Sequence, residues 1–411
     1  MSEEFEPYSR EELAVLGREY LLAGHLIDRA GMPHVIGAFG LEAMRDVAID
    51  EWMGASPIYT RRIRRALGFD GDDVPTIFKG MQFDIGAPHE FMDFRYSVTD
   101  AKHGEFSLAS CGALMDVEPM GEDFVVAMCH DIEDPTFDAT AAATNPRARM
   151  RPVHRPPRVP SDREPHCRWT VGIDDAADPI PEPEAAVRLA AARAATIELS
   201  RGRSTDGDGA RDYAGPFDPD LRLEHFSHDT LVLLLQEFAL QGHLLARSFM
   251  LAVADRFGVE IAERMGTQQL TGIAGLTSRR LAKAIGAGPG LGGVARVLAV
   301  HPAFHPRAYV DVVVDHADAE LIVTLRPCLG LEEGDDLSWP ALLGRSDCGA
   351  VGAAVTAVDG AARVEPVAPP RSGAVASWRV TIGAAGVPAE VPVEVKLTEF
   401  STGAEFDFRT H

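Results

Sequence analysis

Apolar residues near the start of the chain recur at the spacing of a helix. Residues 10–30 show this pattern, and residues 33–53 continue it, with Pro33 at a position that suits a first helical turn. Residues 59–67 predict a short basic helix that ends at Gly68, because glycine readily adopts the left-handed conformation that closes a helix. The apolar positions of the first segment are Leu13, Leu16, Tyr20, Leu22 and Ile27.

The hydrophobic period then changes from the helical value to two. Residues 91–98 alternate strictly between apolar and polar, which is typical of a strand with one buried face. A turn at residues 102–104 leads into a second strand at 105–110. Residues 166–173 alternate again, with Cys167 on the apolar face. The first part of the chain therefore places helices before an antiparallel sheet.

The chain contains an internal repeat. Residues 11–68 align without a gap on residues 229–286, at a constant offset of 218, and 18 of the 58 aligned positions are identical. Each copy carries a Gly-His-Leu, a Phe-Gly and an Arg-Arg sequence at matching positions. The strand around Trp169 matches one around Trp378. A second hairpin is expected at 308–314 and 320–326, with its turn at residues 315–316.

The repeat predicts two tandem copies of one α+β domain. We assign residues 1–199 to the first copy and residues 221–411 to the second. Residues 200–220 are rich in Gly and Asp and lack periodicity, so they are expected to be a linker. Two covalently joined copies are expected to pack as a pseudo-dimer, in the manner of a two-fold homodimer. Further association into a homo-oligomer stays open.

Composition narrows the classes of partner. The net charge of −23 argues against a nucleic acid or an anionic membrane as partner, because both require a basic surface. Five cysteines, an odd and small number, argue against a disulfide framework and favour the reduced cytoplasm. The acidic N-terminus lacks the order of a signal peptide, and no apolar run approaches the roughly 20 residues of a membrane span. A small molecule is the expected partner.

Candidate chemistry gathers between Cys129 and Cys167. The segment begins with Cys129-His130-Asp131 and closes with His166-Cys167, and thiols and imidazoles perform nucleophilic, acid–base or metal chemistry near neutral pH. One hypothesis is a catalytic site made of these five residues, with Cys129 as nucleophile and His130, His166 or Asp131 as base. An alternative is a metal site, zinc for example, held by Cys129, His130, His166 and Cys167. A third hypothesis is a polar loop with packed thiols at both ends. The sequence does not identify a cofactor.

The local structure around these residues is also predicted. Residues 121–128 favour a short helix that ends at Cys129, and Asp134-Pro135 is expected to break it. A thiol at the C-terminal end of a helix is not activated by the helix dipole, so Cys129 would need nearby cations to ionise. The acids that follow could supply a general base or coat a loop with charge. These acids are Asp131, Glu133, Asp134 and Asp138.

Arginines and histidines supply the candidate substrate contacts. A run of arginines after the acids could hold a carboxylate through bidentate hydrogen bonds, or could pair with those acids. A histidine on an otherwise apolar helix is more often a satisfied core residue than a ligand. The candidate substrate-binding residues are Arg147, Arg149, Arg151, His154, His25 and His89.

A series of features in the first copy is shared with a known family. The features are Cys129, Asp131, Phe137, Asn145-Pro146, the basic strand from Arg147 to Arg155, Cys167 and Trp169. Through them the first copy resembles the L-2-amino-thiazoline-4-carboxylate hydrolase-like family over about residues 10–175, with a weaker echo in residues 228–400. The resemblance implies an intracellular hydrolase that opens a C–N or C–S bond of a small heterocycle, which is expected to carry a carboxylate.

The second copy lacks the same reactive residues. Cys348 is its candidate counterpart of Cys129, but no histidine or acidic run follows it. The counterpart of His166-Cys167 lies near Ala376-Ser377. We therefore expect the chemical site in the first copy and a degenerate second copy. The alternative function is a non-catalytic small-ligand-binding or sensor protein with its site between the two copies.

Overall fold

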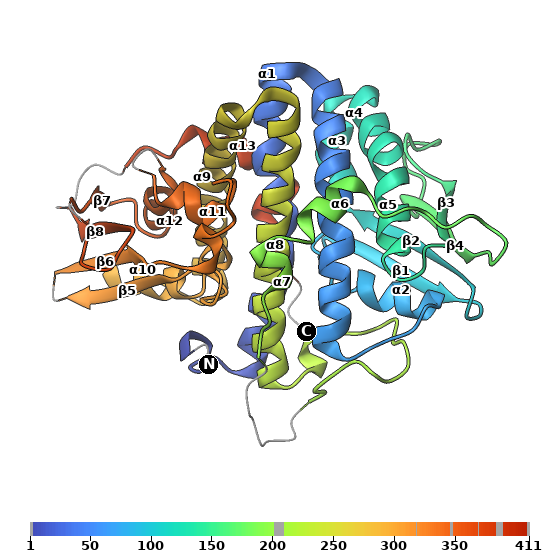
Figure 1. The fold of residues 1–411 in the computed structure, drawn as a ribbon, viewed down its shortest axis with the longest axis horizontal. Helices are drawn as coiled ribbons and strands as arrows, with labels where there is room; N and C mark the ends of the chain where they lie inside the picture. The colour runs from blue at the N-terminus through green and yellow to red at the C-terminus, as the bar shows by residue number, and fades with distance from the viewer. Residues whose placement is uncertain are drawn as a thin grey trace.

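The chain folds into two halves, each built from helices and one four-stranded antiparallel sheet (Figure 1). This arrangement confirms the α+β class and the two sheet-bearing halves that the repeat predicts. The computed structural model describes residues 3–200, 209–317, 319–345, 348–368, 370–383 and 389–408.

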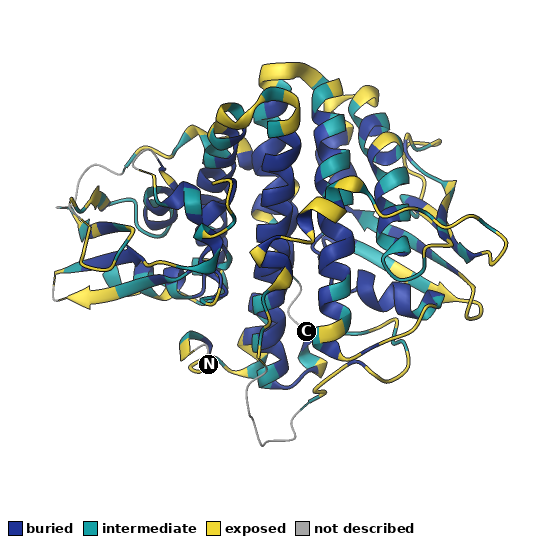
Figure 2. Ribbon diagram, in the orientation of Figure 1, coloured by how far each residue is buried: buried dark blue, intermediate teal, exposed yellow. Residues whose placement is uncertain are grey.

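Long helices stand side by side between the two sheets and form the centre of the molecule (Figure 1). They are the two arms of α1 (Arg10–Leu67), α8 (His228–Phe257) and α9 (Val259–Ala284). Gly40 breaks α1 with φ 85°, and Gly258 separates α8 from α9 with φ 92°. Glycine adopts such conformations without strain. The two glycines match at the repeat offset, so each copy contributes one helical hairpin whose inner faces are buried (Figure 2).

Two predicted helix boundaries in α1 are wrong. The helix continues through Pro33, and residues 59–67 form its last turns instead of a separate helix. A proline nitrogen cannot donate the helical hydrogen bond, which destabilises the turn around Pro33. Packing of α1 against α8 and α9 offsets this loss. The predicted end is confirmed, because Gly68 is left-handed and its N–H donates to the carbonyls of Arg64 and Arg65.

The first sheet has the strand order β1-β2-β4-β3. Strands lie where the alternating segments predict them, within one or two residues. The predicted apolar face of β4 is confirmed, because its alternate residues from Cys167 to Ile173 are buried and the others are more exposed. The strands are β1 (Met92–Val98), β2 (His103–Cys111), β3 (Ala148–His154) and β4 (Cys167–Ile173).

The second sheet repeats this topology in the order β5-β6-β8-β7. Trp378 on β8 pairs with Pro366, as Trp169 on β4 pairs with Pro152. The predicted turn at residues 315–316 is wrong, because β5 continues through both residues. Both residues are exposed on an edge strand, so their polar side chains stay in water and are compatible with a strand. The strands are β5 (Val312–Ala317), β6 (Glu320–Leu325), β7 (Ala362–Pro366) and β8 (Ala376–Ile382).

Short helices complete each half. In the first half they are α2 (Val74–Met81), α3 (Gly112–Val117), α4 (Glu122–Val126), a π-helix (Ala127–Ile132), α5 (Glu133–Ala142), α6 (Glu184–Leu189) and α7 (Arg193–Thr196). In the second half they are α10 (Leu291–Ala299), α11 (Trp339–Leu343), α12 (Ala350–Val358) and α13 (Val393–Thr398).

The two halves meet through reciprocal ion pairs. Arg62 donates to both carboxylate oxygens of Glu237, each at 2.9 Å, and all of these groups are buried. Arg280 donates to Glu19 in the same way, at 2.8 and 3.0 Å. The arginines match each other at the repeat offset, and so do the glutamates. Such reciprocal contacts are those of an isologous dimer interface, so the halves pack as a pseudo-dimer.

The segment between the halves packs on the first half over the part that the structure describes. Lys79 on α2 donates to the carbonyl of Tyr213 at 2.9 Å, and Gln82 donates to that of Asp218 at 2.7 Å. Residues 201–208 of the predicted linker lie outside the described residues. The described part, residues 209–220, is irregular, as its composition predicts, but it covers α2 instead of standing free.

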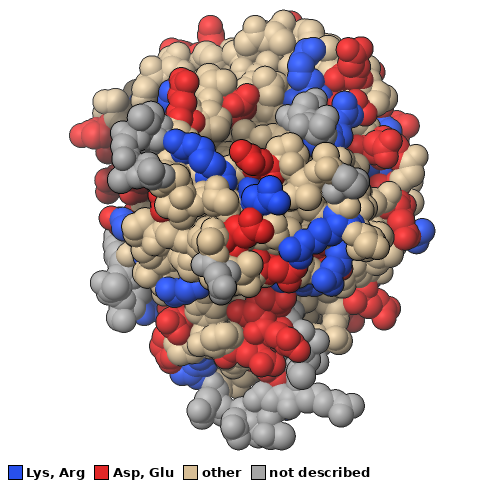
Figure 3. All heavy atoms as spheres, turned by 90° about the vertical axis from the view of Figure 1, so that its left-hand side faces the viewer, with Lys and Arg blue, Asp and Glu red and all other residues tan. Residues whose placement is uncertain are grey.

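The outer surface carries charges of both signs. Figure 3 shows the face of the second half, where lysine and arginine side chains lie among aspartates and glutamates. Within the described ranges, no helix is long and apolar enough to cross a membrane.

Candidate functional site

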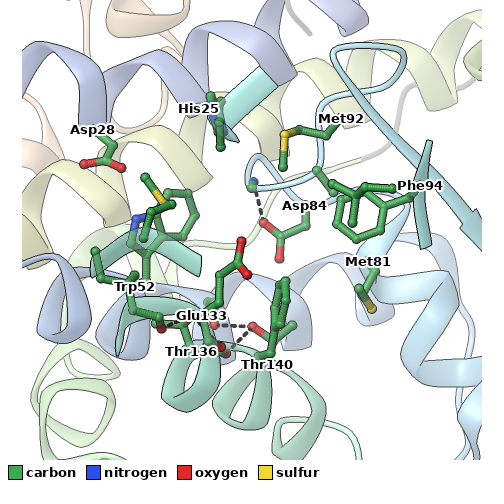
Figure 4. Close-up of a pocket in the computed structure, with 18 of the residues that line it drawn as sticks. His25, Asp28, Trp52, Met81, Asp84, Met92, Phe94, Glu133, Thr136 and Thr140 are labelled. Atoms are coloured by element: carbon green, nitrogen blue, oxygen red, sulfur yellow. Dashed lines mark hydrogen bonds between the residues drawn. The ribbon is translucent and has the colours of Figure 1, made fainter. Parts of the chain in front are cut away.

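A cavity of about 100 Å³ lies inside the first half, between α1, the first sheet and the segment from the π-helix to α5 (Figure 4). Its wall is mainly apolar, with methionine and aromatic side chains from several elements. A mainly apolar cavity with a few placed polar groups is the usual form of a small-ligand site. The polar and charged residues of the wall are His25, Asp28, Arg29, Ser56, Tyr59, Asp84, Glu133, Thr136 and Thr140.

A π-helix places Glu133 at this cavity. The π-helix (Ala127–Ile132) follows α4 directly, and α5 begins at Glu133. A π-turn inserts an extra residue into a helix, which rotates the residues that follow it, and such turns are frequent at functional sites. The predicted break at Asp134-Pro135 is wrong. Pro135 lies in the first turn of α5, where its missing N–H costs little.

One carboxyl oxygen of Glu133 is buried without a partner. The carboxyl group points into the cavity (Figure 4), and its Oε2 atom makes no hydrogen bond. Burial raises the pKa of Glu133 to about 8, Arg155 acts in the opposite direction, and Asp134 raises the pKa further. Glu133 is therefore mainly protonated at neutral pH, and it can donate or accept a proton there.

Asp84 is the second carboxyl group in the wall. It lies in the loop after α2, where its Oδ1 accepts hydrogen bonds from the Tyr59 hydroxyl at 2.8 Å and from the N–H of Gly86 at 2.7 Å. Burial raises the pKa of Asp84 to about 6, although both hydrogen bonds lower it. Asp84 therefore ionises at a lower pH than Glu133, within the same cavity.

Helix α1 contributes a further group of buried charges. Arg29 donates to Asp28 at 2.7 Å and to Asp116 at 3.1 Å. His25 lies one turn earlier, and burial, together with Arg29, lowers its pKa to about 3, so its ring is neutral. Glu51 is fully buried near this group, and neither of its carboxyl oxygens has a hydrogen-bond partner. Burial raises the pKa of Glu51 well above its usual value.

The predicted nucleophile lies in the protein core and does not line the cavity. Cys129 in the π-helix is 2 % exposed, and Cys167 at the start of β4 is 5 % exposed. Burial raises the pKa of both thiols, and Glu133 raises both further. Arg155 lowers the pKa of Cys129, but as the smallest of the named influences. Both side chains are therefore neutral thiols at physiological pH. A nucleophilic cysteine has to be a thiolate.

The other predicted catalytic residues point to separate surroundings. His130 Nε2 donates to the carbonyl of Pro156 at 2.7 Å, and His166 Nδ1 accepts from the N–H of Cys111 at 3.1 Å. Asp131 faces Arg45 at 3.7 Å, at the surface. Among the described residues, no three His, Cys, Asp or Glu side chains are placed to hold a metal ion. The alternative metal site is thus not assembled, because two of its members are core thiols and the two imidazoles bond to backbone groups.

The predicted arginine contacts follow β3 and its flanks, away from the cavity. Arg149 donates to three backbone carbonyls, and Arg151 pairs with Asp138 at 2.9 Å. Arg147 is exposed, and His154 is partly buried. The sequence left open whether these arginines bind a carboxylate ligand or pair with the acidic run. Arg151 pairs with Asp138 of that run.

One predicted substrate contact, His25, lines the cavity. His89 donates from Nε2 to the carbonyl of Gln82 at 2.6 Å and borders a neighbouring groove. Asp84 is not among the candidates from the sequence, and Glu133 carries no more weight there than its acidic neighbours. Asp84 carried a signal, because it is a lone acid between Phe83 and Ile85. Nothing in the sequence separates Glu133 from the other acids, because the π-turn decides which of them faces inward.

Two polar groups of this wall are missing from the described part of the second half. By the separation between the first residues of β3 and β7, which have equivalent strand pairing, Thr136 and Thr140 correspond to Ala350 and Ala354 of α12. Both alanines are buried in the core. Cys167 corresponds to Ala376, as the sequence predicts within one residue. The two threonines thus belong to the first half alone, whereas His25 recurs as His243, and the counterpart of Glu133, residue 347, lies outside the described residues.

Comparisons of the chain with protein-family models, with curated proteins and with solved structures gave no match. The resemblance to the thiazoline-carboxylate hydrolases therefore stays an expectation from the quoted residues.

Proposed function

We propose that this protein binds a small, largely apolar molecule in the cavity of its first half. One observation carries the proposal, namely the Oε2 atom of Glu133, which is buried at the cavity without a hydrogen-bond partner. A buried polar group without a partner costs about 1–3 kcal/mol, and such groups are rare enough in native proteins that each requires an explanation. A bound ligand would supply the missing partner. The expected sensor or binding function is thus retained, with its site inside one half.

A fragment screen tests this proposal. Compounds no larger than one substituted ring are screened for thermal stabilisation, and a ligand at 100 times its Kd stabilises by about 2.7 kcal/mol. Thr140→Leu fills part of the cavity and should abolish stabilisation by the hits. Thr267→Leu is the matched control, because Thr267 also bonds to the carbonyl four residues before it but lies on α9. Hits that bind Thr140→Leu as they bind the natural protein, or the absence of hits, would refute the proposal.

A second candidate is hydrolysis of the bound molecule, as the family resemblance implies. It is favoured by two carboxyl groups in one cavity, Glu133 with a pKa of about 8 and Asp84 with a pKa of about 6. Near neutral pH such a pair can act as general acid and general base on a water molecule and a ring bond. The neutral state of the buried Cys129 makes a thiol mechanism the weaker alternative.

Mass spectrometry of hits and of small cyclic amides and thiazolines, incubated with the protein, tests for this activity. Glu133→Gln should abolish product formation and retain the fold, whereas Cys129→Ser should leave turnover intact. Turnover that survives Glu133→Gln and disappears in Cys129→Ser would support the thiol mechanism instead. A protein that binds fragments but converts none of them would leave the binding function alone.

A further inference from the structure

We infer that the ligand of this cavity is a small organic cation, an apolar body that carries a protonated amine or similar nitrogen base. The inference rests on the proposed function, because it names the chemical class of molecule that the same cavity would bind. Its basis is an imbalance of charged groups in the wall. Glu133 Oε2 is buried without a partner, and among the described residues Asp28 meets only the Trp52 indole besides Arg29.

The basic groups of the wall are already committed. Arg29 is the one arginine among the described residues that line the cavity, and it is bound by Asp28 and Asp116, both buried. His25 lies beside Arg29, with its Nε2 3.5 Å from the guanidinium, which opposes protonation of the ring. No cation of the wall is therefore left for Glu133. Outside the wall, Arg155 lowers the pKa of Glu133 but pairs with Asp134.

The surrounding core adds a further acid. Glu51 lies close enough to Asp28 and Arg29 to interact with both, and its two carboxyl oxygens have no partner. A cation placed in the cavity would favour the ionised form of these acids and form charge-assisted hydrogen bonds, which are about twice as strong as neutral ones. A carboxylate ligand would meet the opposite situation. The arginines that could hold a carboxylate lie along β3, outside the cavity.

The rest of the wall fits the apolar body of such a ligand. Trp52 and Phe94 present aromatic side chains to the cavity (Figure 4), and Phe137 also lines it. Aromatic faces attract cations in addition to covering apolar surface. An apolar cavity of about 150 Å³ accommodates benzene. This cavity, at about 100 Å³, is smaller, so it suits a short branched chain, and a single ring requires a small outward shift of the wall.

A polar groove adjoins the cavity. Ala87, Met92 and Phe94 line both spaces, so the three side chains separate the groove from the cavity. The lining of the groove contains five acids and three arginines among the described residues. Together with the net charge of −23, this excess of acid favours the approach of a cation over that of an anion.

Matched triplets of ligands test the inference. In each triplet the same small ring carries an aminomethyl, a hydroxymethyl or a carboxylate group, as in benzylamine, benzyl alcohol and benzoate. Calorimetry at pH 7 should show the amine binding at least about tenfold more tightly than the alcohol, with the carboxylate weakest. Glu133→Gln should weaken amine binding by about 10- to 100-fold and change alcohol binding little. Glu122→Gln, on the exposed side of α4, is the matched control and should change neither.

The outcomes separate this inference from the proposed function. If the alcohol or the carboxylate binds most tightly, or if folded Glu133→Gln binds the amine unchanged, the ligand is not a cation, although binding in the cavity stands. If no member of any triplet shows binding that Thr140→Leu removes, binding in the cavity fails and the inference fails with it. Should Glu133→Gln not fold, the ratio of amine to alcohol affinity in the natural protein decides.

Discussion

Replacement of Glu133 by glutamine should make the stability of the protein less dependent on pH. The pKa of Glu133 is about 8 in the folded protein, against a usual value of 4.5. Below pH 4.5 the carboxyl is protonated in both the folded and the unfolded state, so it contributes no pH dependence. Between pH 4.5 and 8 the unfolded state ionises while the folded state keeps its proton, so stability falls as the pH rises.

The magnitude follows from the same two values. A pKa that rises from 4.5 to about 8 on folding costs at most roughly 5 kcal/mol once both states are ionised, and roughly 3 kcal/mol at pH 7. Glutamine has nearly the shape of protonated glutamate and cannot ionise. The Glu133→Gln variant should therefore be about as stable as the natural protein at pH 5 and increasingly more stable up to about pH 8.

Urea unfolding from pH 5 to pH 9 measures this difference in each protein. Other titrating groups, Asp84 among them, affect the natural protein and the variant alike, so they cancel in the difference. Glu122→Gln removes an exposed carboxyl of the same type and should follow the natural protein at every pH. A difference between Glu133→Gln and the natural protein that stays constant from pH 5 to pH 9 would refute the assignment of a raised pKa to Glu133.

Three further predictions concern the interface, the thiols and the break between α8 and α9. Glu237→Ala leaves Arg62 buried without its partner and should lower the free energy of unfolding by about 3–5 kcal/mol in urea titrations; a loss under 1 kcal/mol would contradict it. Cys129 should react with iodoacetamide only after unfolding, and rapid labelling of the native protein, seen by mass spectrometry, would disprove its burial. Gly258→Ala should destabilise by about 1–3 kcal/mol through backbone strain, whereas Gly37→Ala, exposed in a helix, should not; equal midpoints would count against this.

The course of the strands was predictable because their signals are local. Alternation in residues 91–98 and 166–173 follows from the side-chain period of a strand, and it set both the position of β1 and the buried face of β4. Helix boundaries were less predictable. Pro33 and Pro135 both occur inside helices, because packing or a preceding π-turn removes the cost that the proline would have in an isolated helix.

The candidate site was predicted only in part. The sequence directed attention to the half and the segment that border the cavity, since α5 and most of the π-helix lie between Cys129 and Cys167. It favoured the thiols because cysteine and histidine are reactive residue types. In the structure, Cys129 and Cys167 are packed in the core, and the cavity instead receives Glu133 and Asp84.

The sequence by itself determined the duplication, the α+β class and the helices-then-sheet order of each half, because identity between copies and hydrophobic periodicity are properties of the linear chain. The tertiary structure alone decided that the Arg62 and Arg280 pairs join the halves and that Glu133 faces a cavity. It also decided which groups titrate unusually. Desolvation depends on every atom packed around a group, and those atoms come from segments far apart in the sequence.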